Sequence, residues 1–193
     1  GRLDIMVNNA GIAPPFPAER VETMVNNQIA RMEGRISDLI PINATVELSD
    51  ADWDRMIRVH LYGTFHGTRA AVRHMTPARS GAIVNIASVL GLRPVAGPLH
   101  YAAAKAGVMA LTRCSAMDVA EHGIRVNAVA PSIAMHPFLA KVTSDELLAD
   151  LAAKEAFGRP AEVWEVANVI VFLASEYSSY LTGEIVSVSS QHP

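Results

Sequence analysis

Three side chains of this 193-residue chain, Ser88, Tyr101 and Lys105, have the types and the spacing that proton transfer requires. Tyr101 and Lys105 are four positions apart, so on a helix they lie on the same face. Ser88 follows the largely apolar run Ala82–Ile86, which is typical of a buried strand. The sequence therefore predicts a hydroxyl at a strand end facing a Tyr/Lys pair, an arrangement able to pass a proton to or from an alcohol or a carbonyl.

The chemistry of this pair depends on the pKa of the tyrosine. A free tyrosine has a pKa of about 10 and is a poor base at neutral pH. A lysine ammonium one helical turn away favours the phenolate and lowers that pKa, and a nicotinamidium ring nearby would lower it further. Ser88 can donate a hydrogen bond to the substrate oxygen. An ordinary amphipathic helix pair with a loop serine would show the same spacing. The rest of the sequence is therefore needed to distinguish a catalytic site from this structural interpretation.

Further motifs follow one another in order along nearly the whole chain: Asn8-Asn9-Ala10-Gly11, Asn85-Ile86-Ala87-Ser88, Tyr101 to Lys105, Arg125 to Pro131, Gly158-Arg159-Pro160, Phe172 to Ser175 and Leu181-Thr182-Gly183. As an ordered set they resemble the short-chain dehydrogenase/reductase family, in particular its 3-oxoacyl reductase-like and hydroxysteroid dehydrogenase-like members. The resemblance implies a Rossmann-like α/β fold, a parallel sheet with helices on both faces. It also implies NAD or NADP as cofactor and a small-molecule alcohol or ketone as substrate.

The resemblance further implies a role for each site residue. Tyr101 would be the general acid/base, Lys105 would lower its pKa and hold the nicotinamide ribose, and Ser88 would orient the substrate oxygen. The residues implied in cofactor binding are Asn8, Asn9, Ala10, Gly11, Tyr101, Lys105, Pro131 and Ile133. A hydrophobic substrate is favoured mildly by the apolar stretch from Phe138 to Leu151 and by an apolar insertion at about 15–42.

The hydrophobic periodicity predicts alternating strands and helices, and therefore a parallel sheet. Strands are expected over 3–7, 82–87, 124–129 and 184–188, and helices over 49–75, 101–120 and 162–175, with a loop and helices over 137–156. In such sheets ligands bind outside the carboxyl ends of the strands. Gly11, Ser88 and Pro131 all fall at such ends, so we expect them to meet in one crevice.

The start of the chain is unusual for this fold. The Gly-rich turn that cradles a pyrophosphate is not present, and about two to three βα units would be needed to supply it. We therefore expect residues 1–193 to form a single, partial Rossmann-like domain that lacks its N-terminal βα units. A helical insertion is expected at about 15–42, with a helix over Ala18–Ile40 that Gly34 weakens and Pro41 ends.

Three positions depart from the family pattern. His60 stands where the family usually has an asparagine that helps to position a water near the lysine, so it is a fourth, doubtful catalytic candidate. Ser132 stands where a glycine usually follows Pro131, and it would be strained if that position needs a positive φ. His136 stands where a threonine usually contacts the cofactor.

Composition excludes several classes of function. The net charge of −3 and the 18% content of charged residues indicate neither a nucleic-acid partner nor a disordered tail. Cys114 is the only cysteine, which fits a cytoplasmic protein, and no apolar run is long enough to span a membrane. No metal site is expected, because His60, His66 and His74 lack the spacing of a helical zinc site. The resemblance implies a homo-oligomer, either a tetramer or a dimer.

Two alternative functions stay open at this point. Halohydrin dehalogenases share the fold and keep the serine and tyrosine, but they use an arginine and no nicotinamide, so Lys105 argues against that class. A catalytically silent scaffold is favoured by the altered positions and by the missing Gly-rich turn. The intact trio of Ser88, Tyr101 and Lys105 favours an active parent protein.

Overall fold

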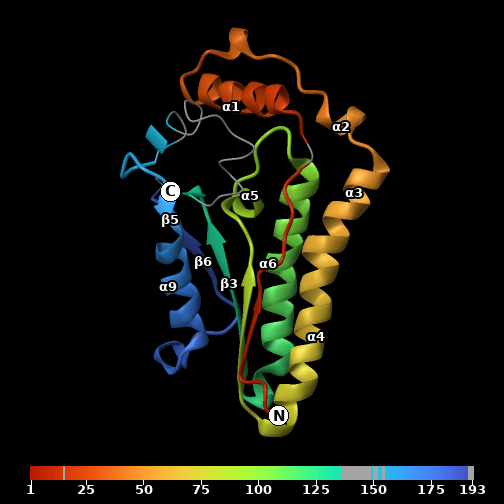
Figure 1. Ribbon diagram of the computed structural model, residues 1–193, viewed down its shortest axis with the longest axis vertical. Helices are drawn as coiled ribbons and strands as arrows, with labels where there is room; N and C mark the ends of the chain where they lie inside the picture. Colours follow the sequence, from red (N-terminus) through yellow and green to blue (C-terminus); the bar gives the residue numbers. More distant parts are fainter. Residues whose placement is uncertain (15, 136–148, 150–151, 154, 191–193) are drawn as a thin grey trace.

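The fold is built on a parallel four-stranded sheet with strand order β1-β2-β3-β6, seen in a computed structural model (Figure 1). The structure describes residues 1–14, 16–135, 149, 152–153 and 155–190. The strands are β1 (Ile5–Asn8), β2 (Gly81–Ile86), β3 (Ile124–Pro131) and β6 (Ile185–Val188). The predicted parallel α/β sheet is thus confirmed, with each strand within a few residues of its expected place.

The central position of β2 and β3 in the sheet explains why their sequences are so apolar. Both strands have a neighbour on each side, and most of their residues are buried. Parallel strands covered on both faces are near-continuous hydrophobic runs. Along β2 the side chains alternate, so Ile83 packs on one face and Val84 on the other.

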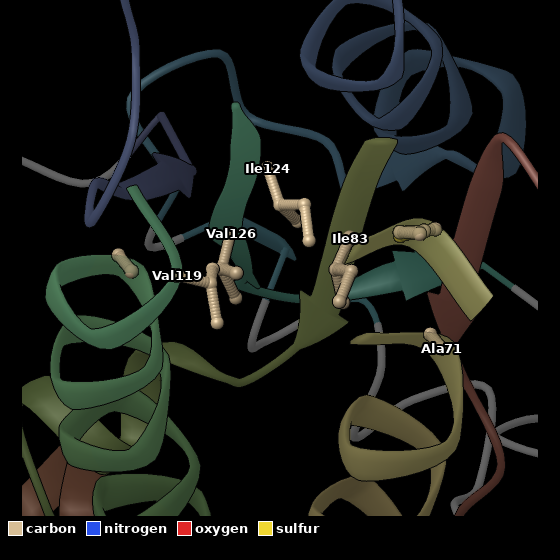
Figure 2. Close-up of a cluster of buried hydrophobic side chains, with 7 residues drawn as sticks. Ala71, Ile83, Val119, Ile124 and Val126 are labelled. Atoms are coloured by element: carbon tan, nitrogen blue, oxygen red, sulfur yellow. The ribbon is translucent and has the colours of Figure 1, made fainter. Parts of the chain in front are cut away.

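Helices α4 (Gly63–Met75) and α6 (Leu99–Val119) cover one face, and α9 (Val163–Ala174) covers the other (Figure 1). Helix α3 (Asp50–Ile57) packs on α6. Figure 2 shows the core on the first face, where α4 and α6 pack on the sheet. Its buried members are Ala71, Met75, Ile83, Ala116, Val119, Ile124 and Val126. On the second face Leu173 of α9 packs against Val84 and Val129. None of the helices in the described part of the chain is long and apolar enough to cross a membrane.

The predicted helix over 49–75 is interrupted in its middle. Ser49 caps its start by accepting a hydrogen bond from the Asp52 N–H at 3.1 Å. Between α3 and α4 the backbone forms a π-helical turn, η2 (Arg58–Tyr62). Such wider turns are rare and occur often at functional sites. This turn contains His60.

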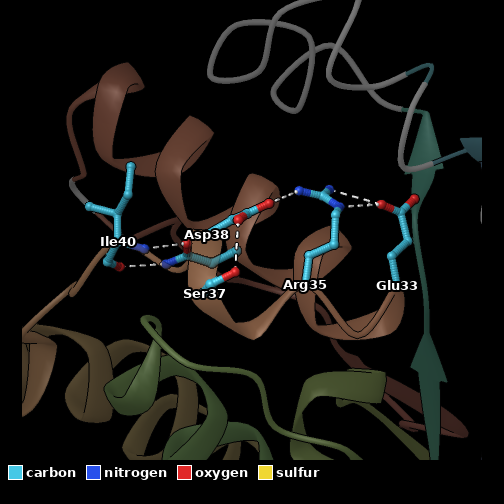
Figure 3. A network of polar contacts seen from close by, with 6 residues as sticks. Glu33, Arg35, Ser37, Asp38 and Ile40 are labelled. Atoms are coloured by element: carbon cyan, nitrogen blue, oxygen red, sulfur yellow. Dashed lines mark hydrogen bonds and ion pairs between the residues drawn. The ribbon is translucent and has the colours of Figure 1, made fainter.

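The helix predicted over Ala18–Ile40 is shorter than expected, because α1 (Ala18–Met32) ends before Gly34. Gly34 has a φ of +74°, a left-handed conformation that closes a helix rather than continuing it. A short 3₁₀ turn, η1 (Ile36–Asp38), follows. Figure 3 shows how this end is held: the guanidinium of Arg35 binds the carboxylates of Glu33 and Asp38. The helix α1 lies across the end of the molecule at which the sheet strands finish (Figure 1).

The remaining elements are short. They are α2 (Ala44–Glu47), η3 (Thr76–Ala78), α5 (Val89–Leu92), η4 (Ala120–His122), β4 (Ala134–Met135), β5 (Ala161–Glu162) and η5 (Glu176–Ser178). Strands β4 and β5 form a small parallel ladder that the sequence did not predict. The loop and helices predicted over 137–156 fall mostly outside the described residues.

Candidate active site

Ser88, Tyr101 and Lys105 meet at the carboxyl end of β2, as their spacing predicted. Ser88 comes two residues after the strand, and its hydroxyl caps α5 by accepting from the Leu90 N–H at 3.2 Å. Tyr101 and Lys105 lie near the start of α6, and the Lys105 Nζ is 5.6 Å from the centre of the Tyr101 ring. The Ser88 side chain lies close enough to the Tyr101 phenol to lower its pKa. The three groups therefore lie together in one site.

Lys105 is held inside the protein rather than at its surface. Its residue is 5% exposed, and its Nζ donates to the carbonyl oxygen of Ile86 at 2.7 Å. That bond fixes the first turns of α6 against the end of β2. Burial disfavours the charged ammonium, and it lowers the pKa of Lys105 to about 8.

The pKa of Tyr101 departs from the sequence-based prediction. Burial of the phenol raises this pKa, and the Ser88 side chain lowers it by less. The net shift of the Tyr101 pKa in this structure is therefore upward, opposite to the lowered pKa that was expected. The physical reason is that the ring is largely enclosed. The phenolate therefore loses more free energy of hydration than its neighbours supply by stabilising the negative charge.

The short helix α5 sets the distance between Ser88 and the other two groups. A Cβ atom on Gly91 would lie 2.9 Å from the backbone nitrogen of Ala106 and 2.9 Å from the backbone carbon of Lys105. Only a glycine lets α5 approach the α6 backbone this closely. The sequence contains no signal for this role of Gly91, because the contact joins segments that are apart in the chain.

The residues after β1 divide into a structural part and an exposed part. The Asn8 side chain donates to Thr68 Oγ1 at 3.1 Å and to Asn85 Oδ1 at 2.8 Å, and Asn85 donates to Thr112 Oγ1 at 2.9 Å. This chain of polar contacts joins β1, α4, β2 and α6. The next three residues, 9–11, are exposed at the carboxyl end of the strand, where their backbone can meet a ligand.

His60 lies with the trio rather than away from it. It is 3% exposed, and its ring meets the Tyr101 ring edge-on with centroids 5.3 Å apart. Burial first, and the nearby Lys105 charge second, lower its pKa to about 4, so the imidazole is neutral at pH 7.

The turn after β3 brings Pro131 and Ile133 to the same edge of the sheet. The Ser132 N–H donates to the Val188 oxygen at 3.0 Å, and the Ile133 oxygen accepts from the Ala161 N–H at 2.8 Å. Ser132 is not among the described residues with positive φ, so the strain considered for this position does not arise. His136 lies outside the described residues.

No metal site accompanies the trio among the described residues, and a groove that they form lies away from it. In the described part of the chain, no group of three or more His, Cys, Asp or Glu side chains could hold a metal ion. A groove of about 630 Å³ lies at the opposite edge of the sheet, beside the amino ends of the strands, and its lining includes Asp4, Gly81 and Ile124. None of the predicted site residues lines that groove.

The residues at the carboxyl edge fit the nicotinamide half of a dinucleotide. An ammonium has three N–H donors, and among the described residues Lys105 makes one hydrogen bond, to Ile86. The remaining donors can serve the hydroxyls of a ribose. The exposed backbone at Gly11 lies at the end of the neighbouring strand β1.

Comparison with known proteins places this arrangement in a family. A family model described as enoyl-(acyl carrier protein) reductase matches residues 39–190. The chain belongs to the short-chain dehydrogenase/reductase family. The family predicted from the ordered motifs is confirmed.

Curated members of the family match almost all of the chain. A (5R,7aS)-5-hydroxy-7a-methyl-1-oxo-2,3,5,6,7,7a-hexahydro-1H-indene-carboxyl-CoA reductase from Mycobacterium tuberculosis (strain ATCC 25618 / H37Rv) is 53% identical over 194 residues, which cover 100% of this chain and 64% of the relative. A cis-4-hydroxycyclohexanecarboxylate dehydrogenase from Sinomonas cyclohexanicum is 41% identical over 188 residues, 97% of this chain and 65% of the relative. The chain thus spans slightly less than two thirds of the length of these relatives.

A solved structure of similar fold holds a dinucleotide. ElxO with NADP bound superimposes with a TM-score of 0.78 at 29% identity, over 97% of this chain and 66% of that one. A protein of this fold therefore binds NADP.

Proposed function

We propose that the complete protein is an NAD(P)-dependent oxidoreductase that interconverts a secondary alcohol and a ketone. The observation that carries the proposal is the trio at the end of β2. Tyr101 lies beside Ser88, which acts on the pKa of its phenol, and the buried Lys105 lies one helical turn further along α6. The presence of lysine, rather than the arginine of halohydrin dehalogenases, favours a nicotinamide enzyme over a lyase.

The proposed mechanism assigns one task to each residue. The Ser88 hydroxyl donates a hydrogen bond to the substrate oxygen and holds it beside the phenol. Tyr101, kept as a neutral phenol by burial, gives its proton to that oxygen during reduction, and it takes the proton back during oxidation. Lys105 binds the nicotinamide ribose and supplies positive charge beside the phenol. The nicotinamide, when bound, supplies or accepts the hydride.

The cofactor would lie along the carboxyl edge of the sheet. We propose that the backbone of Asn9, Ala10 and Gly11 and the turn at Pro131 and Ile133 contact it, together with Tyr101 and Lys105. The Asn8 side chain is engaged with Thr68 and Asn85, so its contribution is to hold the end of β1 in place.

The substrate proposed here is an apolar, ring-bearing or acyl compound. Two relatives act, by their names, on ring compounds that carry a carboxyl-derived group. Helix α1 packs over the loop between Ser88 and Tyr101: a Cβ on Gly97 would lie 2.7 Å from the Met24 sulfur. The apolar side of α1 therefore adjoins the segment that connects the two catalytic hydroxyls.

Replacement of Tyr101 tests this function. In the complete protein, Tyr101→Phe should lower turnover by about 10²–10⁴-fold, because general acid/base catalysis contributes that much. Oxidation or reduction of the dinucleotide is followed by its absorbance, with a cyclohexanol- or acyl-thioester-type substrate. Unchanged turnover at saturating cofactor would refute the mechanism, and no cofactor turnover with any substrate of these classes would favour the silent scaffold.

We also propose that the protein self-associates through α6. Three small residues on this helix, Ala103, Ala106 and Ala110, are exposed. Small side chains let a second helix approach closely. Sedimentation of the complete protein and of an Ala106→Glu variant would test this, with dissociation expected in the variant.

A further inference from the structure

The imidazole of His60 lies between the loop after β1 and the Tyr101 ring. On one side its Nε2 is 2.8 Å from the carbonyl oxygen of Ile12 and 3.2 Å from the Ile12 nitrogen. On the other side the ring meets Tyr101 edge-on at 5.3 Å. The π-helical turn η2 carries the residue, which is 3% exposed.

A single ring nitrogen cannot serve both backbone groups of Ile12 at once. In a neutral imidazole one nitrogen donates and the other accepts. The shorter contact, to the carbonyl oxygen, favours the tautomer in which Nε2–H donates to Ile12. Nδ1 is then a bare acceptor, and it is buried without a hydrogen-bond partner among the described residues. Burial and the Lys105 charge keep the ring neutral, which maintains this pattern.

The imidazole of His60 also fills the space in which a side chain at position 11 would lie. A Cβ atom on Gly11 would lie 2.7 Å from Cε1 of His60 and 3.3 Å from its Nδ1. Real Cβ atoms do not approach carbon this closely. The ring has little room to retreat, since Tyr101 lies against it and Ile12 holds Nε2. Gly11 and His60 therefore fit each other as a pair.

We propose that His60 is a positioning residue that seats the Gly11–Ile12 loop against Tyr101 through a donated Nε2–H hydrogen bond. Its effect on turnover rests on the proposed function, because the loop is placed there at the cofactor and Tyr101 at the substrate. The seating itself is a property of the folded chain. In this role the imidazole carries no proton between groups, so an uncharged amide donor can replace it.

The first test compares His60→Gln with His60→Ala in the complete protein. The amide nitrogen of glutamine lies as many bonds from the backbone as Nε2 of histidine does, so it can reach Ile12. We expect His60→Gln to keep at least about ten times the kcat of His60→Ala, since a lost hydrogen bond of about 1.4 kcal/mol corresponds to a factor of ten. Dinucleotide affinity, measured by fluorescence titration, should weaken in His60→Ala more than in His60→Gln. Equal losses in both variants would overturn the proposal and indicate that the ionisable ring itself is needed.

The second test does not depend on enzymatic activity. Gly11→Ala should lower the melting temperature by about 5 °C, as expected for an overpacked site in a chain of this size. In the His60→Ala background the same change should cost less than about 2 °C, because the clashing ring is gone. Additive effects would refute the pairing. If His60→Ala does not fold, His60→Leu replaces it in the cycle. A coupled pair in a protein without dehydrogenase activity would leave the seating intact and refute only the proposed function.

Discussion

Removing the charge of the buried Lys105 should stabilise the folded protein and, at the same time, abolish its turnover. The pKa of Lys105 is lowered from 10.5 to about 8 by burial, and each pKa unit corresponds to about 1.4 kcal/mol. At pH 7 the folded protein therefore carries a charged ammonium at a cost of about 3 kcal/mol. Lys105→Met keeps the aliphatic length and removes the charge. It also loses the hydrogen bond to Ile86, which offsets about 1 kcal/mol.

We expect Lys105→Met to be more stable than the unaltered protein at pH 7 by about 2 kcal/mol, and to lose its turnover. The sign of the pH dependence follows from proton binding. Between pH 8 and 10.5 the folded protein has released the Lys105 proton, whereas the unfolded chain still binds it. The stability of the unaltered protein rises with pH in this window, by up to about 1.4 kcal/mol per pH unit. The advantage of the variant should therefore vanish before pH 10.

Urea unfolding of both proteins at pH 7, 8, 9 and 10 measures this difference, and other titrating groups cancel because both proteins contain them. Arg113→Met, on the exposed side of the same helix, is the matched control, and its offset from the unaltered protein should not change with pH. Parallel stability curves for Lys105→Met and the unaltered protein would refute the reasoning. So would a variant that is less stable at pH 7.

The remaining predictions concern the polar contacts of Asn85, the turn at Gly123 and the hydroxyl of Ser88. Asn85→Ala should lower the free energy of unfolding by about 2–3 kcal/mol, because it removes the two buried hydrogen bonds that Asn85 makes with Asn8 and Thr112; chemical denaturation measures it. Gly123→Ala should lower the melting temperature by at least about 4 °C, since Gly123 has a φ of +67° and a Cβ there would lie 2.5 Å from the Arg79 oxygen. Ser88→Ala should reduce kcat by about 10²-fold. Because the Ser88 side chain lowers the pKa of Tyr101, this variant should also shift any limb of the pH–rate profile that reports the phenol to higher pH.

The sequence was most informative where chemistry depends on local spacing. The strands could be predicted from apolar runs, and the Tyr101–Lys105 pair from the period of a helix. Features that depend on tertiary contacts could not be predicted. The partners of Asn8 come from positions 60 and 77 residues away. The pKa of Tyr101 follows from burial, which a local pattern does not report. The early end of α1 depends on the left-handed backbone of Gly34, for which a glycine alone is a weak signal.

The π-helical turn η2 has a consequence for reading the evolutionary record of this helix. A turn of this kind holds one residue more than an α-helical turn, and each residue of an α-helix advances the angular phase by about 100°. A relative that lacks one residue between Arg58 and Tyr62 would have lost a wide turn rather than a contact, and the helix would run on without a break. The position aligned with His60 would then point elsewhere. In such a relative, identity at this column of an alignment would be no guide to equivalence in space.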